Sequence, residues 1–282
     1  MGAKKWAMGF GVLLMAGAVG LSAGCAADTE QSDQAANETE EPTAAPEDPF
    51  EANGVVWIAG DSIASPHDQP EYEEPIIGWG EFLADYMTDN ATVHNEARSG
   101  RSAKSYTIET NYKTIMSKMQ AGDCLLIAFG LNDEHEEYDK LYSDPEGSSD
   151  TEGSFQYYLK HDYIEPALEA GVQPVLMTPV TRNFFNKDEG HTVETQTPYV
   201  NAIYTLVEEY AQQGISIYCI DLFEITEQWY EEIGADKVQQ FHGVNAEGEE
   251  DGHFNAAGAA ELAKRIAENI REQNMSLSAY LK

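Results

Sequence analysis

Five short apolar runs, rich in aliphatic and β-branched residues, predict β-strands along the chain. They are Val55–Ala59, Ala91–Asn95, Cys124–Phe129, Gln173–Thr178 and Ile215–Asp221. Stretches with helical spacing of apolar positions alternate with them, at Gly80–Met87, Tyr112–Gln120, Phe155–Ala170, Thr197–Gln213 and Ala256–Glu272. This alternation predicts an α/β protein, a three-layer α/β/α sandwich with five parallel strands in the order 2-1-3-4-5. In such a sheet the functional residues meet at the carboxyl ends of the strands.

The first 25 residues have the pattern of a targeting segment. Lys4 and Lys5 precede an apolar stretch from Trp6 to Leu21, and small residues then lead to Cys25. The segment resembles a bacterial lipoprotein signal, which implies that Cys25 is lipidated and becomes the mature N-terminus. A plain secretory signal and an uncleaved anchor remain open as alternatives. We therefore expect an extracytoplasmic protein, lipid-anchored to the bacterial cell membrane.

Residues 26–52 predict a disordered acidic tether. They are rich in Glu, Asp, Ala, Thr and Pro and contain no Lys or Arg. Such a segment buries too little apolar surface to offset the entropy lost on ordering. We therefore divide the chain into a signal (1–25), a tether (26–52) and one α/β domain (53–282).

Charge and cysteine content exclude several classes of function. The formal net charge of −34 argues against a nucleic-acid partner, because phosphate binding needs a basic face. Cys124 and Cys219 belong to the third and fifth predicted strands, with the fourth between them, so we expect two buried free thiols. The chain lacks H-E-x-x-H, paired C-x-x-C and a Gly-rich phosphate loop. We predict no metal and no cofactor.

Four short motifs, each placed near the end of a predicted strand or the start of a helix, carry the candidate chemistry. In chain order they are Gly60-Asp61-Ser62, Asn95…Gly100-Arg101-Ser102, Gly130-Leu131-Asn132-Asp133 and Asp251-Gly252-His253. Together they supply a serine nucleophile, oxyanion donors, and a histidine base beside a carboxylate. This combination is typical of acyl transfer and predicts a serine esterase.

Each candidate residue has a chemical role and a structural alternative. Ser62 is the predicted nucleophile, although a serine in a strand-to-helix turn is often only an N-cap. His253 is the predicted base, oriented by Asp251. The backbone N–H groups of Ser62 and Gly100 and the side-chain amide of Asn132 form the predicted oxyanion hole, with glycine leaving room for a close approach. A turn asparagine and a turn glycine are the structural alternatives.

The motifs resemble those of the SGNH (GDSL-type) hydrolases, and the fuller pattern is similar to the rhamnogalacturonan acetylesterase group. Besides the four motifs, the resemblance rests on Gly78-Trp79-Gly80, on residues 95–106, 121–123, 174–182 and 251–255, and on Gly258-Ala259, and it covers Val55 to Ile270. It implies a flavodoxin-like sandwich and a Ser62–His253–Asp251 triad. It also implies hydrolysis of acetyl esters on a pectic polysaccharide without a cofactor.

The sequence departs from the family pattern at two positions. One residue separates Asp251 from His253 where the family usually has two, and Glu250 occupies the usual position, so either carboxylate can serve. Leu131 stands where the acetylesterases commonly carry histidine, which bears on substrate preference more than on catalysis.

The few basic residues cluster in loops predicted at the catalytic edge, namely Arg98, Arg101, Lys104 and Arg182. Because salt screens charge beyond about 8–10 Å, a local basic cluster can hold a galacturonate carboxylate despite the negative charge of the whole chain. Trp79 can stack on a sugar ring. Salt bridges to the abundant carboxylates and an ordinary buried tryptophan are the alternatives.

The sequence favours a surface-tethered lipoprotein that removes O-acetyl groups from a polysaccharide, with pectic rhamnogalacturonan as the expected substrate. Two other functions remain open. One is a broader short-chain esterase, lipase-like enzyme or O-acetyltransferase that uses the same acyl-enzyme. The other is a non-catalytic carbohydrate-binding lipoprotein that has kept an esterase fold.

Overall fold

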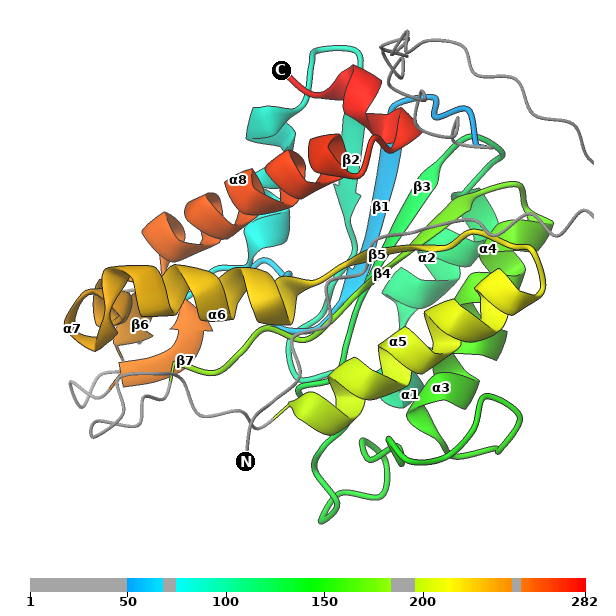
Figure 1. The fold of residues 1–282 in the computed structure, drawn as a ribbon, viewed down its shortest axis with the longest axis horizontal. Coiled ribbons are helices and arrows are strands. Elements are labelled where there is room, and N and C mark those ends of the chain that lie inside the picture. Colours follow the sequence, from blue (N-terminus) through cyan, green and yellow to red (C-terminus); the bar gives the residue numbers. More distant parts are fainter. Residues whose placement is uncertain (1–49, 68–74, 184–195, 245–249) are drawn as a thin grey trace, which may run out of the picture. The chain divides into compact units, whose positions relative to one another are not determined.

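A parallel sheet forms the centre of the fold in the computed structural model, which describes residues 50–67, 75–183, 196–244 and 250–282 (Figure 1). Its strands are β1 (Val55–Gly60), β2 (Thr92–Asn95), β3 (Cys124–Ala128), β4 (Gln173–Met177) and β5 (Tyr218–Ile220). They lie in the order β2-β1-β3-β4-β5, and every neighbouring pair is parallel. The predicted sheet order is confirmed. The predicted signal, Cys25 and nearly all of the predicted tether lie outside the described residues.

The register of the central strands brings their carboxyl ends to one edge. Val56 lies opposite Cys124, which in turn lies opposite Gln173. The residues of β3 and β4 are buried, as expected where helices cover both faces of a parallel sheet. Segments that follow β1, β3 and β4 therefore lie close together although they are far apart in the sequence.

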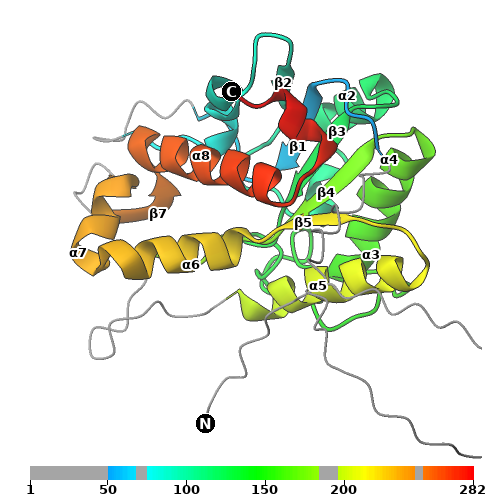
Figure 2. The same ribbon diagram turned by 45° about the horizontal axis from the view of Figure 1, so that its top comes forward.

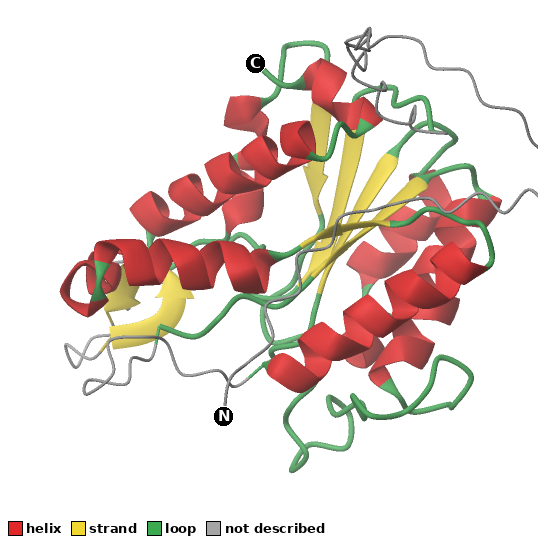
Figure 3. Ribbon diagram, in the orientation of Figure 1, coloured by secondary structure: helices red, strands yellow, loops and turns green. Residues whose placement is uncertain are grey.

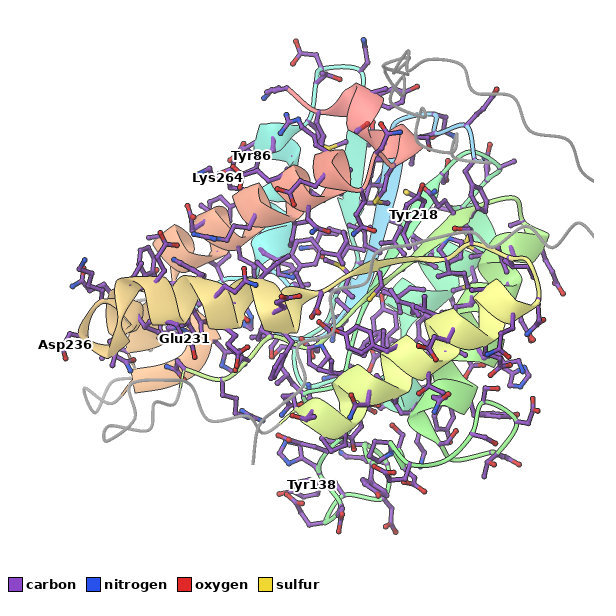
Figure 4. The ribbon with its side chains drawn as sticks, in the orientation of Figure 1. Tyr86, Tyr138, Tyr218, Glu231, Asp236 and Lys264 are labelled. Atoms are coloured by element: carbon purple, nitrogen blue, oxygen red, sulfur yellow. The ribbon has the colours of Figure 1, made fainter. Side chains whose placement is uncertain are left out.

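Helices pack on both faces of the sheet, as Figures 1 and 2 show. One face contacts α1 (Ala103–Tyr106), α2 (Thr110–Lys118), α3 (Phe155–Tyr158), α4 (Glu165–Glu169) and α5 (Thr197–Gln212). The other contacts α6 (Leu222–Ile233), α8 (Ala256–Glu272) and the 3₁₀ turns η1 (Trp79–Glu81), η2 (Leu83–Tyr86) and η5 (Ser276–Tyr280). Figure 4 shows Tyr86 of η2 beside Lys264 of α8, and the Tyr86 hydroxyl donates to the Ala260 carbonyl at 3.1 Å. The three-layer architecture is confirmed.

Two predicted helices have a different local form. The predicted helix 80–87 consists of the two short 3₁₀ turns η1 and η2. The predicted helix 155–170 is α3, the π-helical stretch η3 (Leu159–Ile164) and α4 in continuous succession. Pro166 has no N–H to donate to the Asp162 carbonyl, which instead accepts from the Tyr112 hydroxyl at 2.9 Å. The proline therefore accounts for the wider turn that precedes it.

A small antiparallel sheet follows α6, separate from the main one. After α7 (Ala235–Val238) and η4 (Gln239–Phe241), β6 (His242–Val244) pairs with β7 (Glu250–Phe254). Figure 3 shows these strands beside α6 and α7. His253 lies on β7, a strand that is not among the five predicted from the sequence. Two acidic residues and a glycine in β7 prevent its prediction as a strand, because these residue types are depleted in β-structure.

The predicted free thiols are present in the main sheet. Cys124 is buried and Cys219 is half-buried, and neither forms a disulfide. The Cys124 thiol donates to Gln173 Oε1 at 3.1 Å. No helix in the described part of the chain is both long and apolar enough to cross a membrane.

Candidate active site

Ser62 lies in the turn that leaves β1. The Asp61 N–H donates to the Ala128 carbonyl at 3.2 Å, which extends the pairing of β1 with β3 by one residue. The Asp61 carboxylate then accepts from the Ile63 N–H at 2.9 Å and closes the turn around the serine. Only 6% of Ser62 is exposed. The turn therefore holds the hydroxyl at the carboxyl edge of the sheet, largely shielded from solvent.

The segment 78–80 packs directly beneath this turn. The Gly78 N–H donates to the Ser65 carbonyl at 2.9 Å. A Cβ on Gly78 would lie 2.2 Å from the backbone carbon of Ala64, so only glycine permits this contact. The neighbouring Trp79 ring is fully buried in the core. The prediction that Trp79 stacks on a sugar is therefore wrong, because the ring supports the nucleophile turn from inside the protein.

His253 reaches Ser62 from β7. Its Nε2 atom lies 2.7 Å from Ser62 Oγ. In the neutral tautomer with hydrogen on Nδ1, the hydroxyl donates to Nε2, the arrangement in which an imidazole accepts the proton of a serine. The Phe254 carbonyl accepts from the Ile77 N–H at 2.9 Å and fixes the end of the strand. Two segments 191 residues apart thus form the predicted nucleophile–base pair.

Asn255 holds the strand that carries His253. Its Oδ1 accepts from the Ala257 and Gly258 N–H groups at 3.0 and 3.1 Å, which caps α8. Its Nδ2 donates to the Gln240 and His242 carbonyls at 2.9 and 3.1 Å. This side chain, directly after β7, therefore joins the start of α8 to η4 and β6.

The third member of the triad remains a prediction. Glu250 and Asp251 belong to β7, and their side chains lie outside the described residues. Residues two apart in an extended strand share a face, whereas neighbours lie on opposite faces. The pairing of β6 with β7 is irregular between His242 and Val244, so alternation along an ideal strand does not choose between the two carboxylates.

Gly100 reaches the same edge through the loop after β2. The Arg98 N–H donates to the Gly60 carbonyl at 2.9 Å and continues the pairing of β2 with β1. Gly100 has φ of +72°, in the left-handed region that favours glycine. A Cβ at this position would meet nothing within 4 Å. The backbone conformation therefore favours glycine at this position, and no atom of the described residues would crowd a Cβ there.

Asn132 completes the predicted oxyanion donors. Its Nδ2 donates to the Arg101 carbonyl at 3.1 Å, which ties the loop after β3 to the Gly100 loop and leaves the second amide hydrogen for a ligand. Within the described part of the chain, the backbone N–H groups of Ser62 and Gly100 bond to no carbonyl. Donors from three separate loops therefore lie at one edge.

Each of two buried aspartates directly neighbours one of these donors in the sequence. Burial raises the pKa of Asp61 to about 6, while the bond from the Ile63 N–H and the charge of His253 oppose the rise. Burial raises the pKa of Asp133 to about 7, and the negative charge of Asp61 contributes to the rise. Both carboxyl groups therefore titrate close to neutral pH.

Two of the predicted substrate-binding arginines are held by carboxylates. Arg101 Nη2 lies 2.8 Å from Glu109, and Arg182 forms an ion pair with Glu134. Arg98 is exposed, and no ion pair joins it to another described residue. The salt-bridge alternative therefore describes Arg101 and Arg182, whereas Arg98 remains a candidate for binding a substrate.

Sequence reasoning missed His67. Its Nε2 lies 2.8 Å from the Ser62 carbonyl oxygen, and its ring centre lies 5.8 Å from that of His253. Proximity in sequence to Ser62 was the one available signal.

An exposed tyrosine was missed as well. Tyr138 is 53% exposed on the loop after β3, at the lower edge of Figure 4. Lys104 Nζ donates to the Asp139 carbonyl at 2.6 Å and ties this loop to α1, so the predicted basic residue has a structural contact here.

Comparison with known proteins identifies the family. A family model described as GDSL-like lipase/acylhydrolase matches residues 56–266. The chain belongs to this family. The GDSL hydrolase described here is therefore a carboxylic ester hydrolase, in agreement with the predicted class of enzyme.

Relatives of this GDSL hydrolase include two acetylesterases. The rhamnogalacturonan acetylesterase RhgT of Bacillus subtilis (strain 168) is 32% identical over 235 residues, which cover 80% of this chain and 93% of RhgT. A rhamnogalacturonan acetylesterase of Emericella nidulans is 27% identical over 237 residues, which cover 80% and 89% of the two chains. The Bacillus subtilis protein YXIM has the same fold, with a TM-score of 0.65 at 23% identity. That match spans 79% of this chain and 58% of YXIM.

Proposed function

We propose that this GDSL hydrolase removes O-acetyl groups from rhamnogalacturonan or a closely related pectic polysaccharide. The contact of 2.7 Å between Ser62 Oγ and His253 Nε2 carries the chemical part of the proposal. Similarity to the rhamnogalacturonan acetylesterases supports the substrate, since the match to RhgT spans most of both chains.

The first half of the reaction transfers the acetyl group to Ser62. As Ser62 Oγ attacks the acetyl carbonyl carbon, His253 Nε2 accepts the hydroxyl proton. The negative charge that develops on the carbonyl oxygen is stabilised by the N–H groups of Ser62 and Gly100 and by the Asn132 amide. The bond from this carbon to the sugar oxygen then breaks, and His253 returns the proton to that oxygen. The deacetylated sugar leaves, and acetyl-Ser62 remains.

The second half regenerates the enzyme. His253 takes a proton from water, and the resulting hydroxide attacks the acetyl carbon in the same oxyanion hole. Ser62 Oγ leaves and recovers the proton from His253, and acetate departs. Asp251 is the proposed acid that orients the imidazole and stabilises its charged form, because it lies close to His253 in the sequence and is an aspartate, the residue type of the triad acid.

Arg98 is the proposed contact for an acidic sugar. Its backbone pairs with Gly60, two residues before the nucleophile, and its side chain is exposed. A guanidinium binds a carboxylate well because its planar donors match the two oxygens. The overall charge of −34 repels a polyanionic substrate, so a local cation near Ser62 would help to bind the substrate carboxylate.

Acetate release tests the proposal. The substrates are acetylated rhamnogalacturonan, acetylated xylan, p-nitrophenyl acetate and p-nitrophenyl butyrate, each given to the parent enzyme and to Ser62→Ala. Preferential release from rhamnogalacturonan that disappears in the variant is the expected result. Equal or better hydrolysis of butyrate, with no release from either polysaccharide, would identify a general short-chain esterase instead.

The proposed location of the enzyme is the cell surface, through a lipid on Cys25. The N-terminal pattern of basic, apolar and small residues before this cysteine supports it. Metabolic labelling with a radioactive fatty acid is expected to label the parent and not Cys25→Ser. Labelling of both proteins, or of neither, would contradict the anchor.

A further inference from the structure

The turn after β3 is held by several hydrogen bonds to the buried carboxylate of Asp133. Asp133, next to Asn132, has no exposed surface. The Ala103 N–H lies 3.1 and 3.2 Å from its two carboxylate oxygens. The Ser143 hydroxyl donates to the same carboxylate at 2.7 Å. One buried carboxylate thus joins three segments that are separate in the sequence.

These bonds connect the two loops that supply oxyanion donors. Ala103 begins α1 directly after the Gly100 loop, and its N–H bonds to Asp133. Asn132 Nδ2 donates to the Arg101 carbonyl in that loop. Adjacent side chains therefore hold the Gly100 loop at two points, and the separation between the Gly100 N–H and the Asn132 amide depends on both.

Buried tyrosines make the connection rigid. The Tyr199 hydroxyl lies 2.8 Å from the Asp133 carbonyl oxygen and 3.0 Å from the Ser143 carbonyl oxygen, so its one hydrogen is shared between them. The Tyr163 hydroxyl donates to the Ala103 carbonyl at 2.6 Å. Ala103 and Ser143, which donate to the carboxylate, are thereby also held through their carbonyl groups, so little freedom remains in the loop pair.

We propose that Asp133 is a positioning residue that sets the Gly100 N–H and the Asn132 amide at the spacing one oxyanion needs, an inference that rests on the proposed serine-esterase mechanism. An oxyanion hole works because its donors are already in place when charge develops, so no energy is lost in moving them. A carboxylate suits this task, because it accepts from two donors and forms stronger hydrogen bonds than a neutral group.

The cost of burying Asp133 supports a role beyond packing. Burial raises the pKa of this carboxyl to about 7, which means that the ionised form is held at a disadvantage in the fold. A neutral acceptor would avoid this penalty, but it would form weaker hydrogen bonds to the Ala103 N–H and the Ser143 hydroxyl. The same enzyme contains a buried aspartate at the opposite end of β3 that serves as a matched control.

That control is Asp123, which is 4% exposed and precedes β3. Its carboxylate accepts from Trp57 Nε1 at 2.7 Å, from Asn53 Nδ2 at 2.7 Å and from the Gln120 N–H at 3.0 Å. Asp123→Asn therefore perturbs a buried, hydrogen-bonded carboxylate of the same sheet far along the strand from the oxyanion donors.

The experiment compares Asp133→Asn with Asp123→Asn on p-nitrophenyl acetate, with the melting temperature measured for both. We expect Asp133→Asn to lower kcat by about tenfold to a hundredfold with KM within about twofold of the parent. We expect Asp123→Asn to lower the melting temperature and to leave kcat unchanged. Equal kcat in the parent and Asp133→Asn, or equal losses of kcat in the two variants, would overturn the positioning role.

A double-mutant cycle gives the sharper test, because a positioning residue acts through the donor it positions. We expect Asp133→Asn to cost several-fold less in kcat when Asn132 is already alanine. The same cost in both backgrounds would contradict the inference. Both tests require that the rate of the parent depends on Ser62. If Ser62→Ala kept the parent kcat, the proposed function itself would be rejected, and this result differs from both outcomes of the double-mutant cycle.

Ser143→Ala keeps the test informative if Asp133→Asn does not fold. It removes one hydroxyl donor and retains the buried carboxylate. A smaller loss of kcat, about twofold to fivefold at unchanged KM, is the expected result. An unchanged kcat in Ser143→Ala would then count against Asp133 as a positioning residue.

Discussion

The two ends of strand β3 each hold a buried aspartate, and the two carboxylates differ in their surroundings. Asp123, before the strand, accepts from an indole, an amide and a backbone N–H. Asp133, after the strand, accepts from the Ala103 N–H and the Ser143 hydroxyl and lies close enough to Asp61 for that charge to raise its pKa. The carboxylate at the first end is bound by side chains and backbone of neighbouring segments, whereas the carboxylate at the second end lies close to another acid.

The backbone shows the same difference. At the end where β3 begins, the Gly122 N–H donates to the Gly171 carbonyl at 3.0 Å, and the Gln173 N–H donates to the Asp123 carbonyl at 2.9 Å. At the other end, the N–H groups of Ser62 and Gly100 bond to no carbonyl in the described part of the chain. At the end where β3 begins, the backbone groups bond to one another and stabilise the fold. At the other end, two backbone donors stay available for a reacting ester.

The largest expected effect is the loss of activity in Ser62→Ala. Removing the nucleophile of a serine hydrolase typically costs about 10⁴–10⁶ in kcat. The melting temperature should stay within a few degrees of the parent, because the hydroxyl bonds to His253 at the protein edge and not to the core. Acetate release and thermal unfolding measure the two quantities, and comparable kcat in both proteins would remove Ser62 from the mechanism.

Asn132→Ala should have the next largest effect. Losing one oxyanion donor is expected to lower kcat about a hundredfold to a thousandfold with little change in KM. Asn53→Ala is the matched control at the opposite end, where Asn53 Nδ2 bonds to Asp123 at 2.7 Å. That variant should lower the melting temperature without lowering kcat. A loss of kcat in Asn53→Ala as large as in Asn132→Ala would break the distinction between the two ends.

The pH dependence of stability sharpens the comparison further. Burial raises the pKa of Asp133 from 3.8 to about 7, so the folded protein binds a proton between about pH 4 and 7 that the unfolded chain lacks. This group therefore stabilises the fold increasingly as pH falls through that window, by up to about 1.4 kcal/mol per pH unit, and the contribution is lost as pH rises to 7. Asp61 acts with the same sign, since burial raises its pKa to about 6.

Chemical denaturation at several pH values isolates the contribution of Asp133. The free energy of unfolding of the parent minus that of Asp133→Asn should become more positive as pH falls from 7 to 4. Asp61 is present in both proteins, so its own titration largely cancels in the difference. A difference that stays constant with pH would show that Asp133 does not titrate in this window.

The smallest expected effect concerns Arg98. An exposed ion pair contributes about 0.2–1 kcal/mol, so Arg98→Gln should raise KM for acetylated rhamnogalacturonan by no more than about fivefold, and less at high salt. KM for p-nitrophenyl acetate should stay the same. Lys113→Gln, on an exposed position of α2, changes the net charge by the same amount and should alter neither KM. An equal rise in both variants would indicate a general charge effect.

The main sheet was predictable because its signals are local. Apolar runs alternate with helical stretches, and right-handed crossovers then limit the strand order. The β6–β7 pair could not be predicted in this way, because Glu250 and Gly252 interrupt the apolar pattern in β7. Trp79 was misjudged for a related reason, since composition does not tell whether an aromatic ring faces a ligand or the core.

The catalytic residues could be named from motifs, but the residues that hold the oxyanion donors in place could not. Ser62 and His253 stand out by their neighbours in sequence, whereas the partners of Asp133 lie 10 and 30 residues away at Ser143 and Ala103. Neither partner belongs to a recognisable pattern with the aspartate. Folding alone brings them together, so the support of the oxyanion donors is visible only in the structure.

The most direct test of the account is to locate the acetyl group during turnover. The enzyme is mixed with p-nitrophenyl acetate, quenched rapidly in acid and digested, and the peptide that contains Ser62 is examined by mass spectrometry. The account predicts one added acetyl group on Ser62 in the parent and none in Ser62→Ala, which should also release no acetate above background. Undiminished acetate release by Ser62→Ala, with no acetyl group on this peptide in the parent, would contradict it.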